Sequence, residues 1–397
     1  MELDKAILKS ITEVIKKPYE LGEIPLHEPF FESTNALKYV SECIDSGFVS
    51  SIGKWGSLFE DKICDFTGAK NAILVTNGTV GLRLGLHLAG VKIDNEVLIP
   101  PISFVASANA VSHLGACPHF IDINEENLGM CPIALEKRLN EIAEIKNGVV
   151  INKITKKVIK AIMPVHIFGN PAEIIEIKKV SKKWNLPIVE DAAEALGSWK
   201  KDGDSFVHCG LFGEIGLISF NGNKIITCGG GGVLITNNQK LANEARHLST
   251  TAKKKHKYMF DHDQIGWNDR MPSLNAALGL SQIEELENRI SLKKKLYKKY
   301  QDAFSGIENV RLIKSKKDSI SNNWLISLEI IADDYEAEET SRKLLNKAND
   351  LGIHLRPLWK PLNKLSMYKN CQKGNLKKAE FVSKRIISLP SSPQLML

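Results

Sequence analysis

The sequence predicts an α/β fold, in which a mostly parallel β-sheet is covered by helices and followed by a smaller α+β region. Short apolar runs rich in Val and Ile alternate with helical segments over about 170 residues, as is typical of parallel sheets. The runs are apolar throughout, which indicates strands that are buried on both faces. The length of 397 residues leaves room for a large domain and a smaller one.

Seven runs are expected to form the strands of this sheet, with helices on both of its faces. Only a short polar link separates the last two runs, which suggests an antiparallel pair. The expected strands are 72–75, 96–99, 119–122, 160–165, 187–190, 215–220 and 231–236, and the expected helices are 79–88, 105–114, 132–142 and 172–184.

The chain is expected to divide into a helical extension (1–24), a large domain (25–250) and a small domain (251–397). The extension is predicted to be a helix that leads into a turn at Gly22. The elements expected in the small domain are a long helix over 273–304, a strand over 324–331, a helix over 336–351, a short strand over 353–356 and a final helix over 376–387.

Composition and charge exclude several classes of protein. No apolar run approaches the roughly 20 residues that span a bilayer, and the charge-mixed N-terminus is unlike a signal peptide. We therefore expect a cytoplasmic protein without a membrane partner. The seven cysteines are scattered, which predicts reduced thiols and no metal site. The net charge of +7 is spread along the chain with nearly equal acid, so no nucleic-acid partner is expected.

The turn at 76–79 follows an apolar strand and opens a helix. Free N–H groups and the positive end of the helix dipole favour an anion there, and Gly78 lets the anion approach the backbone. An ordinary helix start, capped by Asn77 or Thr79, explains the same residues. A phosphate site and a simple cap are both open at this point.

Acidic residues follow the strand expected at 187–190. Ligands bind at the carboxyl ends of strands in open α/β sheets, and Ala192 and Ala193 leave space for a flat ligand. A carboxylate such as that of Asp191 can pair there with a cationic ring nitrogen. The alternative is a helix N-terminus, which favours Asp and Glu for electrostatic reasons alone.

Lys224 lies between two expected strands, in a polar turn flanked by apolar residues. In such surroundings a lysine can act as a nucleophile toward carbonyl groups, although most lysines are solvated surface groups. The glycines at 229–232 lack the ending of a P-loop, so a tight connection is expected. At two other strand ends, Phe104 can stack on a ring and His166 can line a site, but a structural role is more common for both residue types.

Seven segments, taken together and in order, resemble the DegT/DnrJ/StrS family of sugar-nucleotide aminotransferases. The resemblance covers roughly residues 25–397. It implies a pyridoxal-phosphate (PLP) enzyme with the aspartate-aminotransferase fold, which is fold type I. The segments are NGTVGLRLGL (77–86), PISFVASANAV (101–111), PVHIFGNP (164–171), VEDAAEALGS (189–198), SFNGNKIITCGGGG (219–232), GWNDRMPSLNAALGLSQ (266–282) and SLPSSP (388–393).

The resemblance implies a role for each matching residue. Lys224 would hold PLP as a Schiff base and then move a proton between substrate and cofactor. Asp191 would keep the pyridine nitrogen protonated, which is a general device of PLP enzymes. Phe104 would stack on the cofactor ring. The phosphate would be bound by Gly78, Thr79 and the hydroxyl of Ser219.

Three further positions matter for the resemblance. Asn268 would reach the phosphate from the neighbouring subunit, which implies a homodimer with active sites at the subunit interface. Glu194 stands where many relatives have Gln near the phenolic oxygen of PLP. A carboxylate beside a phenolate is unfavourable unless one of them is protonated, so the role of Glu194 is open. His166 would line the site.

The resemblance also implies a reaction. Relatives that are 3-dehydratases have His in place of Lys224, so this lysine favours transamination. Segments 24–31, 43–60 and 189–198 look most like the aminotransferases of the legionaminic acid pathway. These would transfer an amino group from L-glutamate to C4 of a UDP-4-keto-6-deoxy-N-acetylglucosamine type substrate, for surface-polysaccharide or nonulosonic acid biosynthesis.

Several alternatives are kept. Related perosamine synthases use GDP-4-keto-6-deoxymannose. A sugar 3-dehydratase and a non-catalytic regulatory protein are less expected. The basic run at 253–257 is expected to be a solvated surface run, with contact to a phosphorylated substrate as the alternative. The segment 47–54 is a further candidate contact of the nucleotide diphosphate, because Lys can serve as a point-charge partner of phosphate.

Overall fold

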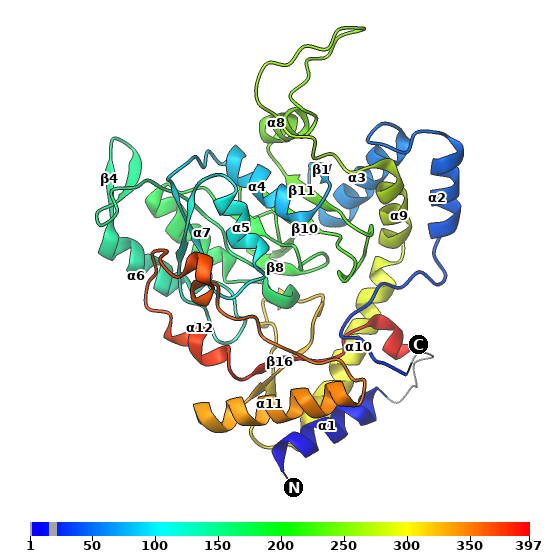
Figure 1. Ribbon diagram of the computed structural model, residues 1–397, viewed down its shortest axis with the longest axis vertical. Helices are drawn as coiled ribbons and strands as arrows, with labels where there is room; N and C mark the ends of the chain where they lie inside the picture. Colours follow the sequence, from blue (N-terminus) through cyan, green and yellow to red (C-terminus); the bar gives the residue numbers. More distant parts are fainter. Residues whose placement is uncertain (1, 16–21) are drawn as a thin grey trace.

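The computed structural model describes residues 2–15 and 22–397 and is built around one central sheet (Figure 1). Four of its strands lie in the order β1 (Asn71–Val75), β11 (Gly232–Thr236), β10 (Ile215–Ser219) and β7 (Val189–Asp191). Parallel bridges join this group to three more strands, in the order β6 (Ile159–Ile162), β2 (Glu96–Ile99) and β3 (Cys117–Phe120).

Within these seven strands, β11 runs antiparallel to β1 and β10, and the other hydrogen-bonded neighbours are parallel. The predicted mostly parallel, seven-stranded sheet is therefore confirmed. The antiparallel pair predicted for the last two strands along the chain is confirmed as well, as β10 and β11. The helices are α1 (Leu3–Val14), α2 (Ala36–Asp45), α3 (Lys54–Thr67), α4 (Gly78–Leu88), α5 (Ala106–Ser112), α6 (Pro132–Ile142), α7 (Ile174–Trp184), α8 (Gln239–Ser249), α9 (Ser273–Ile283), α10 (Leu286–Phe304), α11 (Asp334–Asp350) and α12 (Lys377–Val382).

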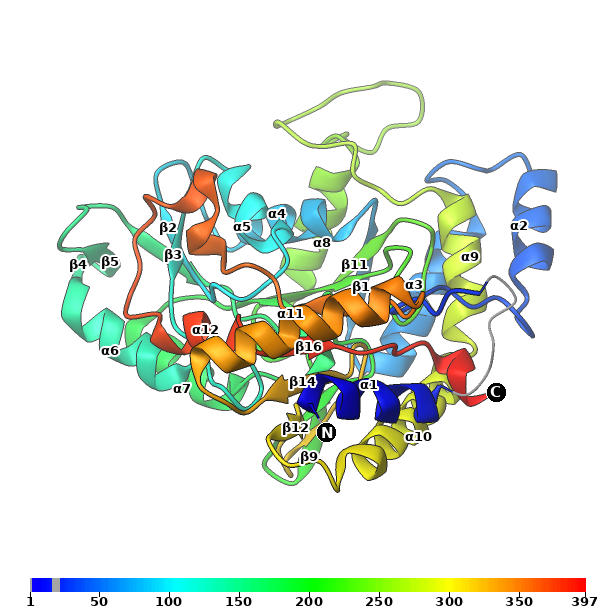
Figure 2. The same ribbon diagram turned by 60° about the horizontal axis from the view of Figure 1, so that its bottom comes forward.

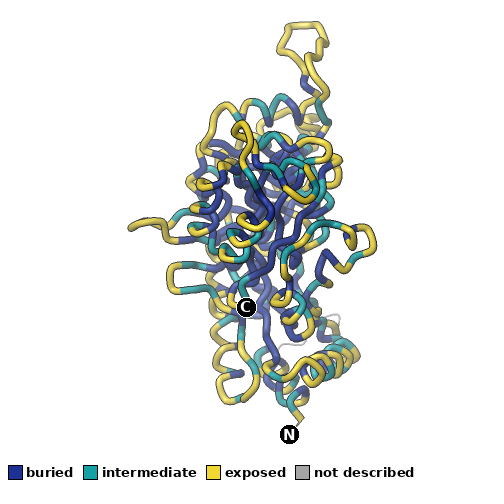
Figure 3. The backbone as a smooth tube through the Cα atoms, turned by 90° about the vertical axis from the view of Figure 1, so that its left-hand side faces the viewer, coloured by how far each residue is buried: buried dark blue, intermediate teal, exposed yellow. Residues whose placement is uncertain are grey.

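Helices cover both faces of the sheet. On β1, Ile73 and Val75 belong to a core that also contains residues of α4, α5 and α8. The alternate residues Ala72 and Leu74 belong to a second core, with α3 and α9. Successive side chains of a strand point to opposite faces, so a strand apolar throughout needs cover on both sides. Figure 3 shows the resulting buried interior beneath an exposed outer layer.

A second, antiparallel sheet lies in the C-terminal part of the chain. Its strand order is β12 (Val310–Leu312), β14 (Ser327–Ile330), β16 (Ile386–Ser388) and β15 (Arg356–Pro357). Helix α1 packs on α10 and α11 beside this sheet, through Ile7 and Ile11 (Figure 2). The predicted N-terminal helix therefore exists over Leu3–Val14, and it contacts the C-terminal part. The rest of that prediction falls partly on residues 16–21, which lie outside the described residues.

Two predicted helices are wrong in detail. The helix expected over 273–304 is interrupted at Glu284 and Glu285, between α9 and α10. The helix expected over 376–387 ends at Val382, and the strand β16 follows it. All three residues of β16 are buried between β14 and β15, so their apolar character serves a sheet. A short apolar run does not distinguish the two structures.

Some elements had no counterpart among the predicted ones. These are the helices α2, α3 and α8 and two hairpins, β4 (Ala143–Lys146) with β5 (Val149–Asn152) and β8 (Trp199–Asp202) with β9 (Ser205–His208). The short strand β13 (Ser319–Ile320), from the C-terminal part, pairs with β8.

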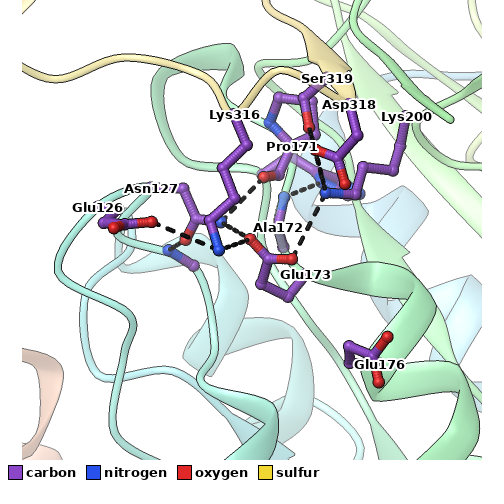
Figure 4. A network of polar contacts seen from close by, with 12 residues as sticks. Glu126, Asn127, Pro171, Ala172, Glu173, Glu176, Lys200, Lys316, Asp318 and Ser319 are labelled. Atoms are coloured by element: carbon purple, nitrogen blue, oxygen red, sulfur yellow. Dashed lines mark hydrogen bonds and ion pairs between the residues drawn. The ribbon is translucent and has the colours of Figure 1, made fainter.

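A network of charged side chains fastens β13 to the rest of the molecule (Figure 4). The Nζ atom of Lys200 on β8 lies 3.0 Å from Asp318, 3.2 Å from the hydroxyl of Ser319 and 3.4 Å from Glu173. Lys316 approaches the other oxygen of Glu173 at 3.0 Å. The side chain of Lys200 is only 2% exposed, while its partner Asp318 is 49% exposed, so the network runs from the interior to the surface.

The loop between α8 and α9 extends away from the body of the molecule, at the top of Figure 1. It carries the basic run at 253–257, all of it exposed. None of the helices in the described ranges combines the length and apolar character that crossing a membrane requires.

Candidate active site

A cavity of about 870 Å³ opens at the carboxyl ends of β7 and β10. This is the edge at which ligands bind in open α/β sheets. The cavity brings together residues that are far apart in the sequence, including most of those singled out by the motifs. The predicted site residues in its lining are Gly78, Thr79, Phe104, Asp191, Glu194, Ser219 and Lys224.

The first turn of α4 forms one end of the cavity. Asn77 caps the helix, because its side-chain oxygen accepts a hydrogen bond of 3.0 Å from the N–H of Val80. The next N–H groups, of Gly78 and Thr79, are at a helix start and have no partner within the helix. A Cβ on Gly78 would lie 3.3 Å from the Ser219 side chain, so only glycine leaves this corner open. The predicted cap is confirmed for Asn77, and the phosphate site stays a prediction, for which a capped helix start is suitable.

Asp191 ends β7 and is 4% exposed. One of its carboxylate oxygens accepts a hydrogen bond of 2.6 Å from the Ser107 hydroxyl, and the other accepts one of 3.2 Å from the N–H of Ala193. Burial raises the pKa of Asp191, while these donors act in the opposite direction. A buried carboxylate with fixed donors is well suited to hold a cationic group in the cavity.

Lys224 and Glu194 form a pair inside the cavity. The Lys224 Nζ lies 3.2 Å from Glu194 Oε1 and 3.7 Å from the centre of the Trp324 ring. The indole N–H of Trp324 donates to the carbonyl of Asn223 at 2.8 Å, which fixes the ring beside the lysine. An ammonium group over an aromatic face is attracted by the ring quadrupole. Lys224 is therefore held between a carboxylate and an aromatic ring.

The second oxygen of Glu194 is also fixed. It accepts a hydrogen bond of 2.7 Å from the N–H of Phe168, whose backbone adopts the left-handed conformation with φ +57°. Burial raises the pKa of Glu194, and the charge of Lys224 opposes this effect. The Phe168 ring packs against Trp359 with 4.9 Å between ring centres and an angle of 39° between the ring planes. This unusual turn therefore both orients the carboxylate and builds an aromatic wall.

The lining residues that were not singled out from the sequence include His27, Phe168, Trp324 and Trp359. Phe168 lies in a segment that carries the family resemblance, and this signal could have found it. His27 is 8% exposed, and neither ring nitrogen has a hydrogen-bond partner in the described part of the chain. Burial and nearby cations, chiefly Lys293, lower the pKa of His27 well below its usual range, so the ring is neutral at neutral pH.

The prediction that His166 lines the site is not supported by the geometry. His166 is fully buried, its Nε2 lies 3.0 Å from Glu190, and its Nδ1 accepts a hydrogen bond of 3.1 Å from the N–H of Ala172. The neighbouring Val165 is the residue in the lining. Adjacent residues of an extended segment point to opposite sides, so His166 faces away from the cavity.

Asn268 lies outside the lining as well, on the surface of the molecule. Both of its neighbours in the chain are anchored to Arg83 on α4. Asp269 forms an ion pair with Arg83, and the Trp267 ring lies 4.5 Å from the Arg83 guanidinium carbon. Asn268 is thus exposed on a firmly held turn, where it contributes nothing to the cavity of its own chain.

The chain is similar to known proteins over most of its length. Residues 32–397 match the model of the DegT/DnrJ/EryC1/StrS aminotransferase family. The chain belongs to this family. It is 34% identical over 373 residues to a GDP-perosamine synthase of Escherichia coli O157:H7, covering 94% of each protein. A GDP-perosamine synthase of Vibrio cholerae is 32% identical over 373 residues, covering 94% of this chain and 95% of the relative.

A solved structure with the same fold is that of the Helicobacter pylori aminotransferase PseC, which is involved in the biosynthesis of pseudoaminic acid. It superposes with a TM-score of 0.81 at 26% sequence identity and covers 93% of each chain. The protein is therefore a PLP-dependent sugar aminotransferase of fold type I. The cavity fits the cofactor, since it offers a lysine, a buried carboxylate and a helix-start cradle that a Cβ on Gly78 would fill.

Proposed function

We propose that this enzyme transfers an amino group from L-glutamate to C4 of a nucleotide-linked 4-keto-6-deoxy sugar. The observation that supports this most strongly is the meeting of Lys224, Asp191 and the start of α4 in one cavity. PLP bound there supplies an electron sink for the transfer. In this proposal the side chains of the protein hold the cofactor and move protons.

Each side chain has a distinct task in this proposal. Lys224 would hold the cofactor covalently and, once released, carry a proton to and from the reacting carbon. Asp191 would hold the proton on the ring nitrogen. Phe104, which is 56% exposed, would cover the ring. The phosphate would be held by the N–H groups of Gly78 and Thr79 and by the Ser219 hydroxyl.

The proposal also covers the nucleotide of the substrate, for which there are two candidates. The two perosamine synthases among the relatives favour a GDP-linked substrate, GDP-4-keto-6-deoxymannose. The segments 24–31 and 43–60 look more like the legionaminic acid subgroup, and they favour a UDP-linked 4-keto-6-deoxy-N-acetylglucosamine as the second candidate. In either case a lysine, in place of the His of 3-dehydratases, favours amination over deoxygenation.

One assay tests the reaction and the nucleotide together. Purified enzyme with PLP and L-glutamate is incubated with each 4-keto sugar in parallel, and the products are identified by mass. The proposal predicts a 4-amino sugar from one of the two substrates and no product without glutamate. A deoxygenated sugar, or no product from either substrate, would contradict it.

We further propose that two copies of the chain share their active sites, with Asn268 reaching the phosphate bound by its partner. The exposure of Asn268 on a held turn supports this, and so do large exposed apolar residues on the loop before it. Tyr258 is 77%, Phe260 80% and Ile265 89% exposed. Such side chains on one loop are typical of a protein interface.

Mixing two inactive variants tests the shared site. Lys224→Ala and Asn268→Ala are each assayed alone at limiting PLP, then unfolded together and refolded as a mixture. If Asn268 acts across the interface, mixed dimers contain one site with both residues, and activity returns. If Asn268 acts within its own chain, no site has both residues, and the mixture stays inactive.

A further inference from the structure

Glu194 and Lys224 form a direct ion pair inside the cavity. Glu194 Oε1 lies 3.2 Å from Nζ, while Oε2 is bound by the Phe168 N–H at 2.7 Å. The Glu194 and Lys224 side chains are 5% and 12% exposed, so water screens the pair poorly. Glu194 Oε1 is the hydrogen-bond acceptor of Nζ within the described ranges, and the Trp324 ring covers another side of it.

This geometry ties the charge of one group to the charge of the other. A buried carboxylate is stable as an anion only while a cation or enough donors face it. Glu194 has one N–H donor and one cation. A lysine can attack a carbonyl only as a neutral amine, and in that form it no longer balances the carboxylate. Burial already raises the pKa of Glu194, with Lys224 as the main opposing influence.

We propose that Glu194 is a positioning residue that controls the protonation of Lys224. The carboxylate holds the free lysine as an ammonium ion, takes its proton when the lysine attacks, and keeps that proton while the displaced lysine acts as a base. This inference rests on the proposed function, because it assumes that Lys224 is the lysine that binds PLP. It gives this chain's carboxylate a task at a position where the family resemblance leaves its role open.

The proton transfer balances without any further reagent. The Lys224 ammonium gives one proton to the Glu194 carboxylate and becomes a neutral amine. The amine lone pair forms a C–N bond at the carbonyl carbon, and the carbonyl oxygen leaves as water with the two remaining amine hydrogens. When a donor amine displaces Lys224 from that carbon, the lysine leaves as a neutral amine and Glu194 keeps its proton. The freed lysine can then first take a proton from the reacting carbon as a base and afterwards deliver it as an acid.

Other groups around the pair set its background charge. Asp191 acts on Glu194 from the end of β7 and disfavours a second negative charge. His27 borders Lys224, and because its ring is neutral it adds no charge. The Phe168 N–H and the Trp324 ring approach from the other sides but do not titrate. Asp191 and Glu194 both act on the charge of Lys224, and Glu194 is the one that contacts its ammonium group.

The test measures how fast cofactor-free protein forms its covalent bond with PLP, followed by absorbance over a range of pH. In the wild type the rate should rise with pH, because attack on the carbonyl group requires a neutral amine. Glu194→Gln removes the negative charge that stabilises the ammonium form. The midpoint of the profile should therefore move to lower pH by about 1–3 units. Glu194→Asp, with its carboxylate drawn back, should give a smaller shift in the same direction.

A matched control is Glu173→Gln, which removes a carboxylate from the Lys200 pair outside the cavity and should leave the midpoint unchanged. Circular dichroism checks that each variant is folded. Coincident midpoints for the wild type, Glu194→Gln and Glu194→Asp would overturn the inference. Failure of the wild type to form any absorbing adduct would instead overturn the proposed role of Lys224, so the two failures are distinguishable.

Discussion

Two lysines of this protein each pair with a glutamate, yet their surroundings differ. Lys200 is 2% exposed, and its Nζ has three oxygen acceptors, from Glu173, Asp318 and Ser319 (Figure 4). Lys224 has Glu194 as its hydrogen-bond partner in the described part of the chain and otherwise meets an aromatic ring and an open cavity. An ammonium group has three donors, so only Lys200 is saturated.

The difference separates a structural lysine from a reactive one. The three hydrogen bonds of the Lys200 Nζ help to hold β13 against β8. They leave this nitrogen no lone pair and no space for a reactant. At Lys224 the single carboxylate can receive a proton, and the cavity can admit a carbonyl group. Substitutions at the two lysines should therefore affect different properties.

Replacing Lys224 with Ala should abolish transamination, with kcat falling by roughly 10⁴-fold or more, because both the covalent attachment and the proton carrier are lost. The unfolding midpoint should change little, since Lys224 lies at the edge of a cavity. Turnover of amino sugar by the variant is the measurement. Activity within about tenfold of the wild type would remove Lys224 from the mechanism.

Replacing Asp191 with Asn should lower kcat by roughly 10²-fold or more, because the amide carries no negative charge to stabilise a protonated ring nitrogen. The amide oxygen can keep the hydrogen bond from the N–H of Ala193, and the Ser107 hydroxyl can turn to accept one from the amide NH2 group. Steady-state kinetics with saturating PLP separates this loss from weaker cofactor binding. Unchanged kcat would show that the carboxylate is structural.

Replacing Lys200 with Met should reverse the pattern seen at Lys224. The free energy of unfolding should fall by about 1–3 kcal/mol, because the hydrogen bonds of the buried Lys200 are lost, although Glu173 keeps Lys316 as a partner. Urea denaturation measures this loss. In the remaining folded protein, kcat should stay near the wild-type value. A stable variant with impaired kcat would mean that the network serves the chemistry.

A smaller effect is expected at low pH from His208, which is fully buried. Burial lowers the pKa of His208 to about 4, below its ordinary 6.5. The unfolded chain therefore binds a proton at a pH where the folded chain does not, so stability falls as the pH falls. From about pH 7 to about pH 5.5 this should cost about 1 kcal/mol.

The matched variant for this effect is His208→Gln. The glutamine keeps an acceptor for the N–H of Gly197 and cannot titrate. Urea denaturation at both ends of the pH range should show a smaller loss in the variant than in the wild type. Equal losses would assign the acid sensitivity to other groups.

The residues that could be predicted from the sequence are those held by local structure. Gly78 lies in a helix start, Asp191 at a strand end and Lys224 in a turn between strands, and each has a short-range signal. His27 and Trp324 reach the same cavity from distant parts of the chain, and no local pattern encodes that meeting. His166 was misplaced because its side of an extended segment depends on register, which the sheet decides.

The central claim is that Lys224 is the lysine that binds PLP covalently. It is tested most directly by reducing the PLP-loaded enzyme with borohydride, digesting it and locating the modified lysine by mass spectrometry. The account predicts a phosphopyridoxyl group on Lys224, none on Lys200, and no incorporation in Lys224→Ala. A modified lysine elsewhere with Lys224 unmodified would contradict it.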